Sequence, residues 1–188
     1  KLISKHYKLL QLDTGRIYRY VASIKINEPK KFGYKYIKKK IEKLKIKDLK
    51  SKKLLSDKVA TIASLIAKDK KIRSIVHSFQ LKCANSPPKK YKGSCLDGRD
   101  ICSVILPFAD VKLFITASTK IRAMRRYKEL KVKNNKITYS EVLKSIKKRD
   151  KSDINRKISP LKKTDDSILI NTTNLSISRC FLKIKKII

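Results

Sequence analysis

The sequence predicts an α/β protein with a parallel sheet. Short apolar runs alternate along the chain with longer segments in which apolar residues recur every three or four positions. One run, Val111–Ala117, is apolar almost without a break, which is typical of a parallel strand covered on both faces. Hydrophobic residues make up 41% of the 188 residues, too many for a disordered basic tail. We therefore expect one packed α/β domain, with small appendages at most.

The chain is expected to open on the end of a helix, Lys1–His6, followed by a strand. Lys8–Leu12 is a short apolar run that ends at the turn-forming triplet Asp13-Thr14-Gly15. A helix should follow, because Ile17 and Val21 are spaced to lie on one of its faces.

The next segment, Tyr34–Lys47, has two readings. The spacing of Ile37 and Ile41 fits a helix, whereas the alternation of Leu44 and Ile46 fits a strand. The pattern alone leaves both open.

Two helices are expected before the middle of the chain. Ser56 and Asp57 are typical N-terminal caps for the first. The second covers about Lys71–Leu81 and is broken by Asn85-Ser86-Pro87-Pro88.

The second half of the chain repeats the alternation of strand and helix. Strands are expected at Ser94–Asp97, Val111–Ala117 and Ser167–Ile170, and helices at Ser118–Leu130, Ser140–Lys148 and Leu175–Ile187.

The charge is extreme. Lys and Arg total 50 against 15 Asp and Glu, a formal net charge of +35. The basic residues are 40 Lys and only 10 Arg, in a chain with 25 Ile, 8 Ala and no Trp. This usage is typical of drift toward AT-rich codons, which puts lysine on any solvated surface, but a polyanion partner explains the charge equally well. Composition leaves both explanations open.

Cysteines and histidines give no metal signature. The four Cys lack paired C-x-x-C spacing, and the two His are far apart, so we assign no protein ligands to a metal. Reduced core thiols and the lack of an apolar run long enough for a membrane span favour a cytoplasmic protein.

Arginine positions are informative where lysine is the default cation, because only arginine offers a planar fork for phosphate. Leu12–Arg19 joins a strand to a helix N-terminus, where the Thr14 hydroxyl and Arg19 can meet an anion. Leu96–Asp100 follows a strand at the edge where α/β ligands bind.

A third segment, Arg149–Arg156, is a dense mixed-sign stretch expected as a hinge after a helix, like a lid over charged ligands. Another helix carries a cluster of Arg122, Arg125 and Arg126. The alternative for all these arginines is structural pairing with nearby Asp, and the sequence leaves it open.

In this order, the motifs D-T-G-x-x-Y-R, D-G-R-D and R-D-x-x-D-x-N-R resemble those of bacterial cytidylate kinase, a nucleoside monophosphate kinase family. The resemblance covers nearly the whole chain. It implies ATP-dependent phosphorylation of CMP and dCMP with Mg²⁺, and the excess lysine then reads as composition drift, with no nucleic-acid or membrane partner and a monomeric state.

The resemblance also implies residue roles. Ser64, Arg73 and Asp100 match the cytosine readers. Thr14, Arg19, Arg99 and Arg156 match the clamp on the CMP phosphate. Arg149 and Asp153 match the lid side, with Asp153 on the ribose hydroxyls, and Arg99, Arg149 and Arg156 are the catalytic candidates. Arg122 and Arg126 are candidate ATP-side residues.

The family's phosphate-binding loop, G-x-x-x-x-G-K-G-T, has no counterpart in the sequence, and Lys1–His6 aligns with the helix after it. The expected fold is P-loop NTPase-like, a three-layer α/β/α arrangement with a parallel sheet whose first strand and phosphate loop are missing. Its domains would be a core (1–19, 90–148 and 157–188), a CMP-binding domain with a shortened insert (20–89) and a lid (149–156). Little or no kinase activity is expected of such a chain alone, and near-family rates of CMP-dependent ADP formation would contradict this.

Two departures from the family pattern stand beside these matches: Cys102-Ser103 replaces a small Gly-Thr pair, and Asn171 replaces an Asp. Three alternatives are weighed against the resemblance. A related kinase for UMP or AMP would read the base differently, a basic RNA-binding module would carry exposed aromatics among its basic patches, and a structural subunit would have no activity.

Overall fold

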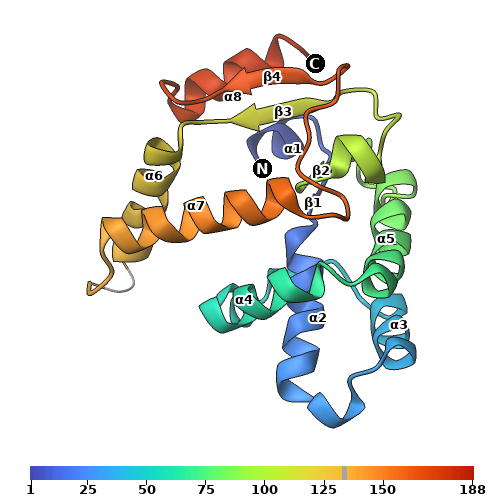
Figure 1. The fold of residues 1–188 in the computed structure, drawn as a ribbon. Helices are drawn as coiled ribbons and strands as arrows, with labels where there is room; N and C mark the ends of the chain where they lie inside the picture. The colour runs from blue at the N-terminus through green and yellow to red at the C-terminus, as the bar shows by residue number, and fades with distance from the viewer. Residues whose placement is uncertain (133–134) are drawn as a thin grey trace. The chain divides into compact units, whose positions relative to one another are not determined.

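A computed structural model describes residues 1–132 and 135–188 and divides into two compact units. Unit 1 is Lys1–Ile101 and unit 2 is Cys102–Ile188. Each contains a two-stranded parallel sheet with helices around it, so the predicted α/β class with parallel strands is confirmed (Figure 1). None of the described helices is long and apolar enough to cross a membrane.

Unit 1 holds two strands whose ends define the site discussed below. Strands β1 (Leu10–Asp13) and β2 (Ser94–Asp97) pair in parallel, with Leu10 opposite Ser94 and Asp13 opposite Asp97. The elements are α1 (Leu2–His6), β1 (Leu10–Asp13), α2 (Gly15–Asn27), the 3₁₀ turn η1 (Pro29–Lys31), α3 (Tyr34–Glu42), the 3₁₀ turns η2 (Asp48–Lys50) and η3 (Lys52–Leu55), α4 (Asp57–Ile66), α5 (Lys70–Asn85) and β2 (Ser94–Asp97).

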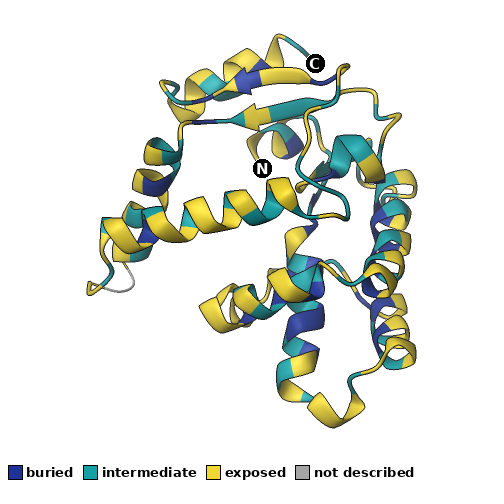
Figure 2. Cartoon of the chain, in the orientation of Figure 1, coloured by how far each residue is buried: buried dark blue, intermediate teal, exposed yellow. Residues whose placement is uncertain are grey.

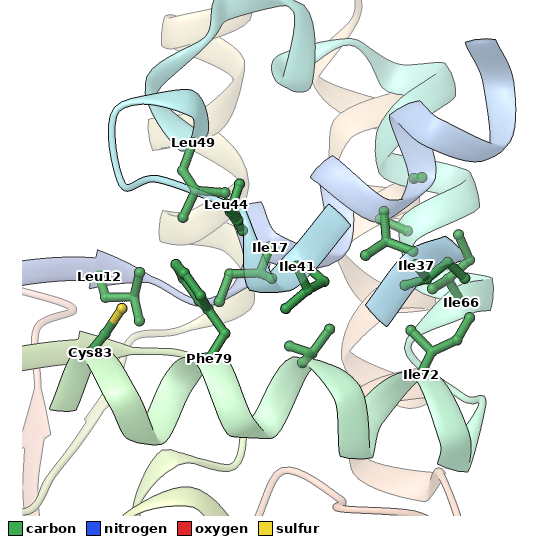
Figure 3. Packing of buried hydrophobic residues seen from close by; sticks show 14 of the residues in the cluster. Leu12, Ile17, Ile37, Ile41, Leu44, Leu49, Ile66, Ile72, Phe79 and Cys83 are labelled. Atoms are coloured by element: carbon green, nitrogen blue, oxygen red, sulfur yellow. The ribbon is translucent and has the colours of Figure 1, made fainter. Parts of the chain in front are cut away.

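One hydrophobic core holds unit 1 together. Helix α2 buries Ile17 and Val21 completely, one helical turn apart, and packs against α4. Figure 3 shows Ile17, Leu49, Phe79 and other core side chains converging between β1, α3 and α5. Full burial of a side chain of this size contributes about 1.5–3 kcal/mol, so this core fixes the helices that carry the site.

The ambiguity over Tyr34–Lys47 is resolved as a helix, α3, that ends at Glu42. Ile37 and Ile41 are buried on one face of α3, which packs on α5 (Figure 2). Leu44 is buried after the helix has ended, so its side chain anchors a turn rather than a strand.

Unit 2, like unit 1, consists of a two-stranded parallel sheet and helices, with fewer elements. A single turn of π-helix, η4 (Ile101–Ile105), lies at the boundary in sequence. The elements that follow are β3 (Leu113–Thr116), α6 (Thr119–Lys131), α7 (Tyr139–Asn155), β4 (Ile168–Asn171) and α8 (Ile177–Lys185). Strands β3 and β4 are parallel, with Leu113 opposite Ile168.

The expectation that Val111–Ala117 is covered on both faces is wrong for unit 2. Ile115 is 54% exposed, although its register partner Ile170 is fully buried. In the described part of unit 2, β3 pairs with β4 alone, so its side chains have strand neighbours on one side only.

The expectation that a hinge begins after Lys148 is also wrong. Helix α7 continues to Asn155, so Arg149–Asn155 forms its last turns. Arg149 and Asp153 are four residues apart with their charged atoms at 3.7 Å, a spacing that supports a helix, and no Gly or Pro interrupts the segment. The charged stretch is an extension of the helix, and α5 likewise extends beyond the predicted Leu81 to Asn85.

Candidate functional site

The junction of β1 and α2 brings together the first and second sequence motifs. Thr14 is buried at the N-cap position of α2 but makes no side-chain capping hydrogen bond to the helix. Its backbone N–H and its hydroxyl both donate to the carbonyl of Asp97, at 3.0 and 2.8 Å. Gly98 lies against the Thr14 hydroxyl so closely that a Cβ at position 98 would come inside 3.0 Å of it. The glycine of the D-G-R-D motif is therefore required by the approach of Thr14.

Two carboxylates meet at the same strand ends. Asp13 and Asp97 are register partners in the parallel pair. Asp97 keeps part of its surface in water, but desolvation by neighbouring protein atoms and the negative charge of Asp13 raise its pKa. Arg16 lies beside the pair, with its Nε 3.4 Å from an Asp13 oxygen. The pair is a locus of negative charge in an otherwise basic chain.

Asp97→Asn should stabilise the protein near neutral pH, by about 0.5 kcal/mol. Because the folded state raises this pKa, ionisation penalises folding, and the penalty is absent at low pH and grows as pH rises through the folded pKa. Urea unfolding at pH 4 and pH 7 should show a larger gain at pH 7. Asp110→Asn, at an exposed carboxylate, is the control; an equal gain in both variants would contradict this cause.

Two arginines on the first turns of α2 are held by backbone carbonyls. Arg16 donates through Nη1 to the carbonyl of Leu49 at 2.8 Å, and Arg19 donates through Nη1 to the carbonyl of Leu54 at 2.9 Å. The side chains of Leu49 and Leu54 are buried, which fixes these carbonyls in place. Arg16 and Arg19 are therefore held in defined positions on α2.

Arg73 and Asp100 form the most buried ion pair of unit 1 among the residues described. The side chains are 11% and 7% exposed, and Nη2 of Arg73 donates to Oδ2 of Asp100. Arg73 also donates to the carbonyl of Ala67 at 3.1 Å, and its guanidinium lies 5.7 Å from the centre of the Tyr18 ring. A planar cation, a carboxylate and an aromatic ring thus lie together, a set that suits a flat heterocycle with polar edges.

The other residues assigned to unit 1 lie around these contacts. Ser64 is exposed in the last turn of α4, three residues before Ala67, whose carbonyl holds Arg73. Arg99 is exposed between Gly98 and Asp100. The structure therefore brings Arg73 and Asp100 into contact and gives no direct contact between Ser64 and either of them.

In unit 2, the three lid residues face one another at the end of α7. The carboxylate oxygens of Asp153 lie 3.7 Å from Nε of Arg149 and 3.8 Å from Nη1 of Arg156. Arg156 also donates from Nε to the carbonyl of Ser159, which has a φ of 49°, a left-handed conformation unusual for serine. Asp153 and Arg156 are mostly buried, whereas Arg149 is 59% exposed.

Arg122 is committed to structure. It contacts both carboxylate oxygens of Asp150, at 2.9 and 2.7 Å, and also the carbonyl of Ala117 and the hydroxyl of Thr119. Four of its five N–H groups are used in this way. The bidentate contact joins α6 to α7, so structural pairing, the alternative for the arginines, describes Arg122 well.

The neighbours of Arg122 differ from it. Arg125 donates to Thr172 and to the carbonyl of Leu175, which ties α6 to the end of β4. Arg126 is on the surface, with its Nη1 3.0 Å from Glu129. Nearby, Asn171 accepts from the backbone N–H and the hydroxyl of Thr173, contacts that an Asp could also make.

Arg122→Lys should lower the free energy of unfolding by about 1–2 kcal/mol, because an ammonium group cannot reproduce a bidentate contact with Asp150. Urea denaturation followed by circular dichroism measures this change. Arg126→Lys is the matched control, and its exposed pair with Glu129 should cost less than about 0.5 kcal/mol. Equal losses in both variants would show that the bidentate geometry is unimportant.

Sequence reasoning missed three contributors to the site. Tyr18 has the apolar spacing of its helix and no further sequence signal, and the stacking of Arg73 on its ring depends on how α2 and α5 pack. Arg16 was passed over, although its spacing from Arg19 places both near one helix face. The carbonyls of Leu49 and Leu54 carry no sequence signal at all, because any residue supplies a carbonyl.

Comparison with known proteins gives a consistent result. The profile of the family described as "Cytidylate kinase" matches residues 1–188. A protein of Fervidobacterium nodosum named "Cytidylate kinase" is 39% identical, over 100% of this chain and 88% of its own length. Proteins with the same name from Thermosipho melanesiensis and Fusobacterium nucleatum are each 37% identical, over 100% and 94% of this chain and 88% and 84% of their own lengths. The comparisons give no support to a basic RNA-binding module.

Proposed function

This chain belongs to the cytidylate kinase family, and on that premise we propose how its residues divide the work of transferring a phosphoryl group from ATP to CMP. The activity is that of a nucleoside monophosphate kinase. The observation that carries the residue assignment is the buried pair of Arg73 and Asp100. Asp100 is the last residue of the D-G-R-D motif, and Arg73 lies against the ring of Tyr18. We propose dCMP as a second acceptor.

Cytosine recognition is proposed for Ser64, Arg73 and Asp100. The carboxylate of Asp100 and the hydroxyl of Ser64 would accept from the exocyclic amine of cytosine, while Arg73 would donate to N3 and O2. Uracil presents a carbonyl where cytosine has the amine, which would leave a buried acceptor facing an acceptor. The low exposure of Asp100 supports this proposal, because an unmatched contact costs most where water is excluded.

The phosphate clamp is proposed for Thr14, Arg19, Arg99 and Arg156. Thr14 would meet the phosphate by turning its hydroxyl hydrogen, which here donates to the Asp97 carbonyl, toward a phosphate oxygen. The anchoring of Arg19 on the carbonyl of Leu54 supports its assignment, since its guanidinium is in place before a ligand arrives. Such preorganisation reduces the ordering cost of binding. Arg99 is exposed after the glycine, where its side chain can reach an anion.

Arg99, Arg149 and Arg156 are the proposed catalytic residues. Phosphoryl transfer depends on positioning and on neutralising charge on the moving group, and guanidinium groups perform both tasks. Asp153 holds Arg149 and Arg156 together and is also the proposed partner of the ribose hydroxyls. Catalysis by positioning and charge neutralisation requires no histidine as a general base.

Mg²⁺ is proposed as the companion of ATP, where it would neutralise phosphate charge. Mg²⁺ usually binds through one or two carboxylates together with substrate phosphates and water. Asp13 and Asp97 fit that requirement, since they are register partners whose carboxylates follow one another at the ends of β1 and β2. These two residues would supply the protein oxygens.

Arg122 and Arg126 were the candidate ATP-side residues, and we propose that role for Arg126 rather than Arg122, whose donors are occupied. The division into a core, a CMP-binding domain at 20–89 and a lid at 149–156 stays a prediction. So do the cytoplasmic location, the monomeric state and the absence of a nucleic-acid partner.

Calorimetric titration of the chain with CMP and UMP tests the proposal without depending on turnover. CMP should bind about 10- to 100-fold more tightly than UMP, the ratio expected from one or two unmatched buried hydrogen bonds. Ser64→Ala should reduce the ratio while leaving the circular dichroism spectrum unchanged, since Ser64 is exposed. Equal affinity for the two nucleotides, or no binding of either, would contradict the proposal.

A further inference from the structure

Unit 1 carries a concentration of lysine next to the anchored arginines of α2. The segment Lys45–Lys53, which we call the lysine segment, contains five lysines and a single acidic residue in nine positions. All five ammonium-bearing residues are exposed. The nine residues thus carry a net charge of +4, from five Lys less one Asp, which exceeds the average density of the chain.

The charge of these lysines is not cancelled locally. Within the described part of the chain, no ion pair involves any lysine of the segment. The one acid, Asp48, accepts instead from the backbone N–H of Lys45 at 2.9 Å. The segment therefore presents net positive charge directly to solvent.

The lysine segment leads directly into the backbone carbonyl that holds Arg19 of the proposed phosphate clamp. The carbonyl of Leu49, within the segment, accepts from Arg16, and the carbonyl of Leu54, one residue after it, accepts from Arg19. Figure 3 shows the Leu49 side chain directed into the core, and Leu54 is also buried, so the lysines between and beside them are left at the surface. Every lysine of the segment is within nine residues of Leu54, whose carbonyl holds Arg19.

The range of the charges fits this arrangement. Consecutive Cα atoms are 3.8 Å apart, so Lys52 and Lys53 begin within about 8 Å of the Leu54 backbone. The Debye length is about 8 Å at physiological ionic strength and about 30 Å at 0.01 M. At low salt all five lysines add to the potential at Arg19, and at physiological salt the nearest ones still do.

We propose that the lysine segment is an electrostatic guide that speeds the encounter of nucleotide phosphates with the clamp at Arg19. The inference rests on the proposed function, because it takes the dianionic CMP phosphate as the ligand. A basic surface adjoining a binding site raises association rates without adding contacts in the bound state. The dissociation rate is then independent of these lysines.

The test is stopped-flow association of CMP, followed by tyrosine emission. The chain has 8 Tyr and no Trp, and Tyr18 lies against Arg73, so binding at the base site should change the signal. The variant replaces Lys45, Lys47, Lys50, Lys52 and Lys53 by Gln. The control replaces five exposed lysines of unit 2 by Gln: Lys162, Lys163, Lys183, Lys185 and Lys186. It removes the same total charge as the variant.

At 0.01 M salt, the association rate constant of the lysine-segment variant should fall about tenfold. The fall should shrink as salt is raised, with the dissociation rate unchanged, and the control should retain nearly the parent rate. Equal rates in parent and variant, or equal falls in variant and control, would overturn the guide while leaving CMP binding intact. Failure of the parent chain to bind CMP at equilibrium would overturn the proposed function and the guide with it.

Discussion

Arg73→Ala should lower the free energy of unfolding by about 3–5 kcal/mol and remove most of the preference for CMP over UMP. Removing one partner of a buried ion pair leaves the other charge buried and uncompensated, which is the costly case. Asp100 is only 7% exposed, so little water can replace the guanidinium. Unfolding by guanidinium chloride measures the loss of stability. Calorimetric titration with CMP and UMP measures the loss of preference.

Two further variants separate stability from recognition at this pair. The double variant Arg73→Ala/Asp100→Ala removes both charges and should recover part of the lost stability while still failing to select CMP. Arg73→Lys keeps the charge but loses the planar fork, and should discriminate poorly between the bases. If Arg73→Ala left the affinity for CMP unchanged, a kinase reading a different base would be the better description.

Gly98→Ala should destabilise the fold by about 1–3 kcal/mol and weaken CMP binding about 10- to 100-fold. A Cβ there would fall inside 3.0 Å of the Thr14 hydroxyl and of Ile101. The hydroxyl cannot easily yield, because Thr14 is buried and donates to the carbonyl of Asp97. Relief of the clash must displace Thr14, a proposed phosphate contact. Thermal unfolding and titration with CMP measure the two effects.

Gly33→Ala is the matched control. A Cβ at position 33 would meet nothing within 4 Å, and the backbone there is extended, with a φ of −156°. Because Gly33 caps α3, a loss of up to about 1 kcal/mol is expected, with no change in CMP affinity. The double variant Thr14→Ala/Gly98→Ala should be more stable than the two single losses combined, since the first change makes room for the second. Strict additivity would contradict the close approach as the cause.

The sequence predicted the elements and the family well, and for a clear reason. Apolar spacing marks the buried face of α2 through Ile17 and Val21, and Ser56 caps α4 by accepting from the N–H of Val59, as expected of a serine in that position. The family prediction is confirmed by the comparisons. Signals of this kind are local, so they can be read from neighbouring residues alone.

The site was predicted less completely, because side-chain partnerships depend on packing. Arg73 and Asp100 are 27 residues apart, and only the fold shows that they form a buried pair. Arg122 was a candidate for ATP, yet its fork is filled by Asp150 from the next helix. The boundary after Lys148 was misjudged because a run of mixed charge is typical of loops, whereas here Arg149 and Asp153 support one another along a helix.

The continuity of α7 has a thermodynamic consequence for the residues at its end. A loop that orders over a ligand loses about 1–2 kcal/mol of backbone entropy per residue at the moment of binding. In unit 2, Arg149 and Asp153 already belong to a helix that starts at a capping box formed by Thr138 and Glu141 and that is braced by Arg122. Their ordering cost is met when the protein folds, so a nucleotide that engages them spends its binding energy on contacts rather than on building the helix.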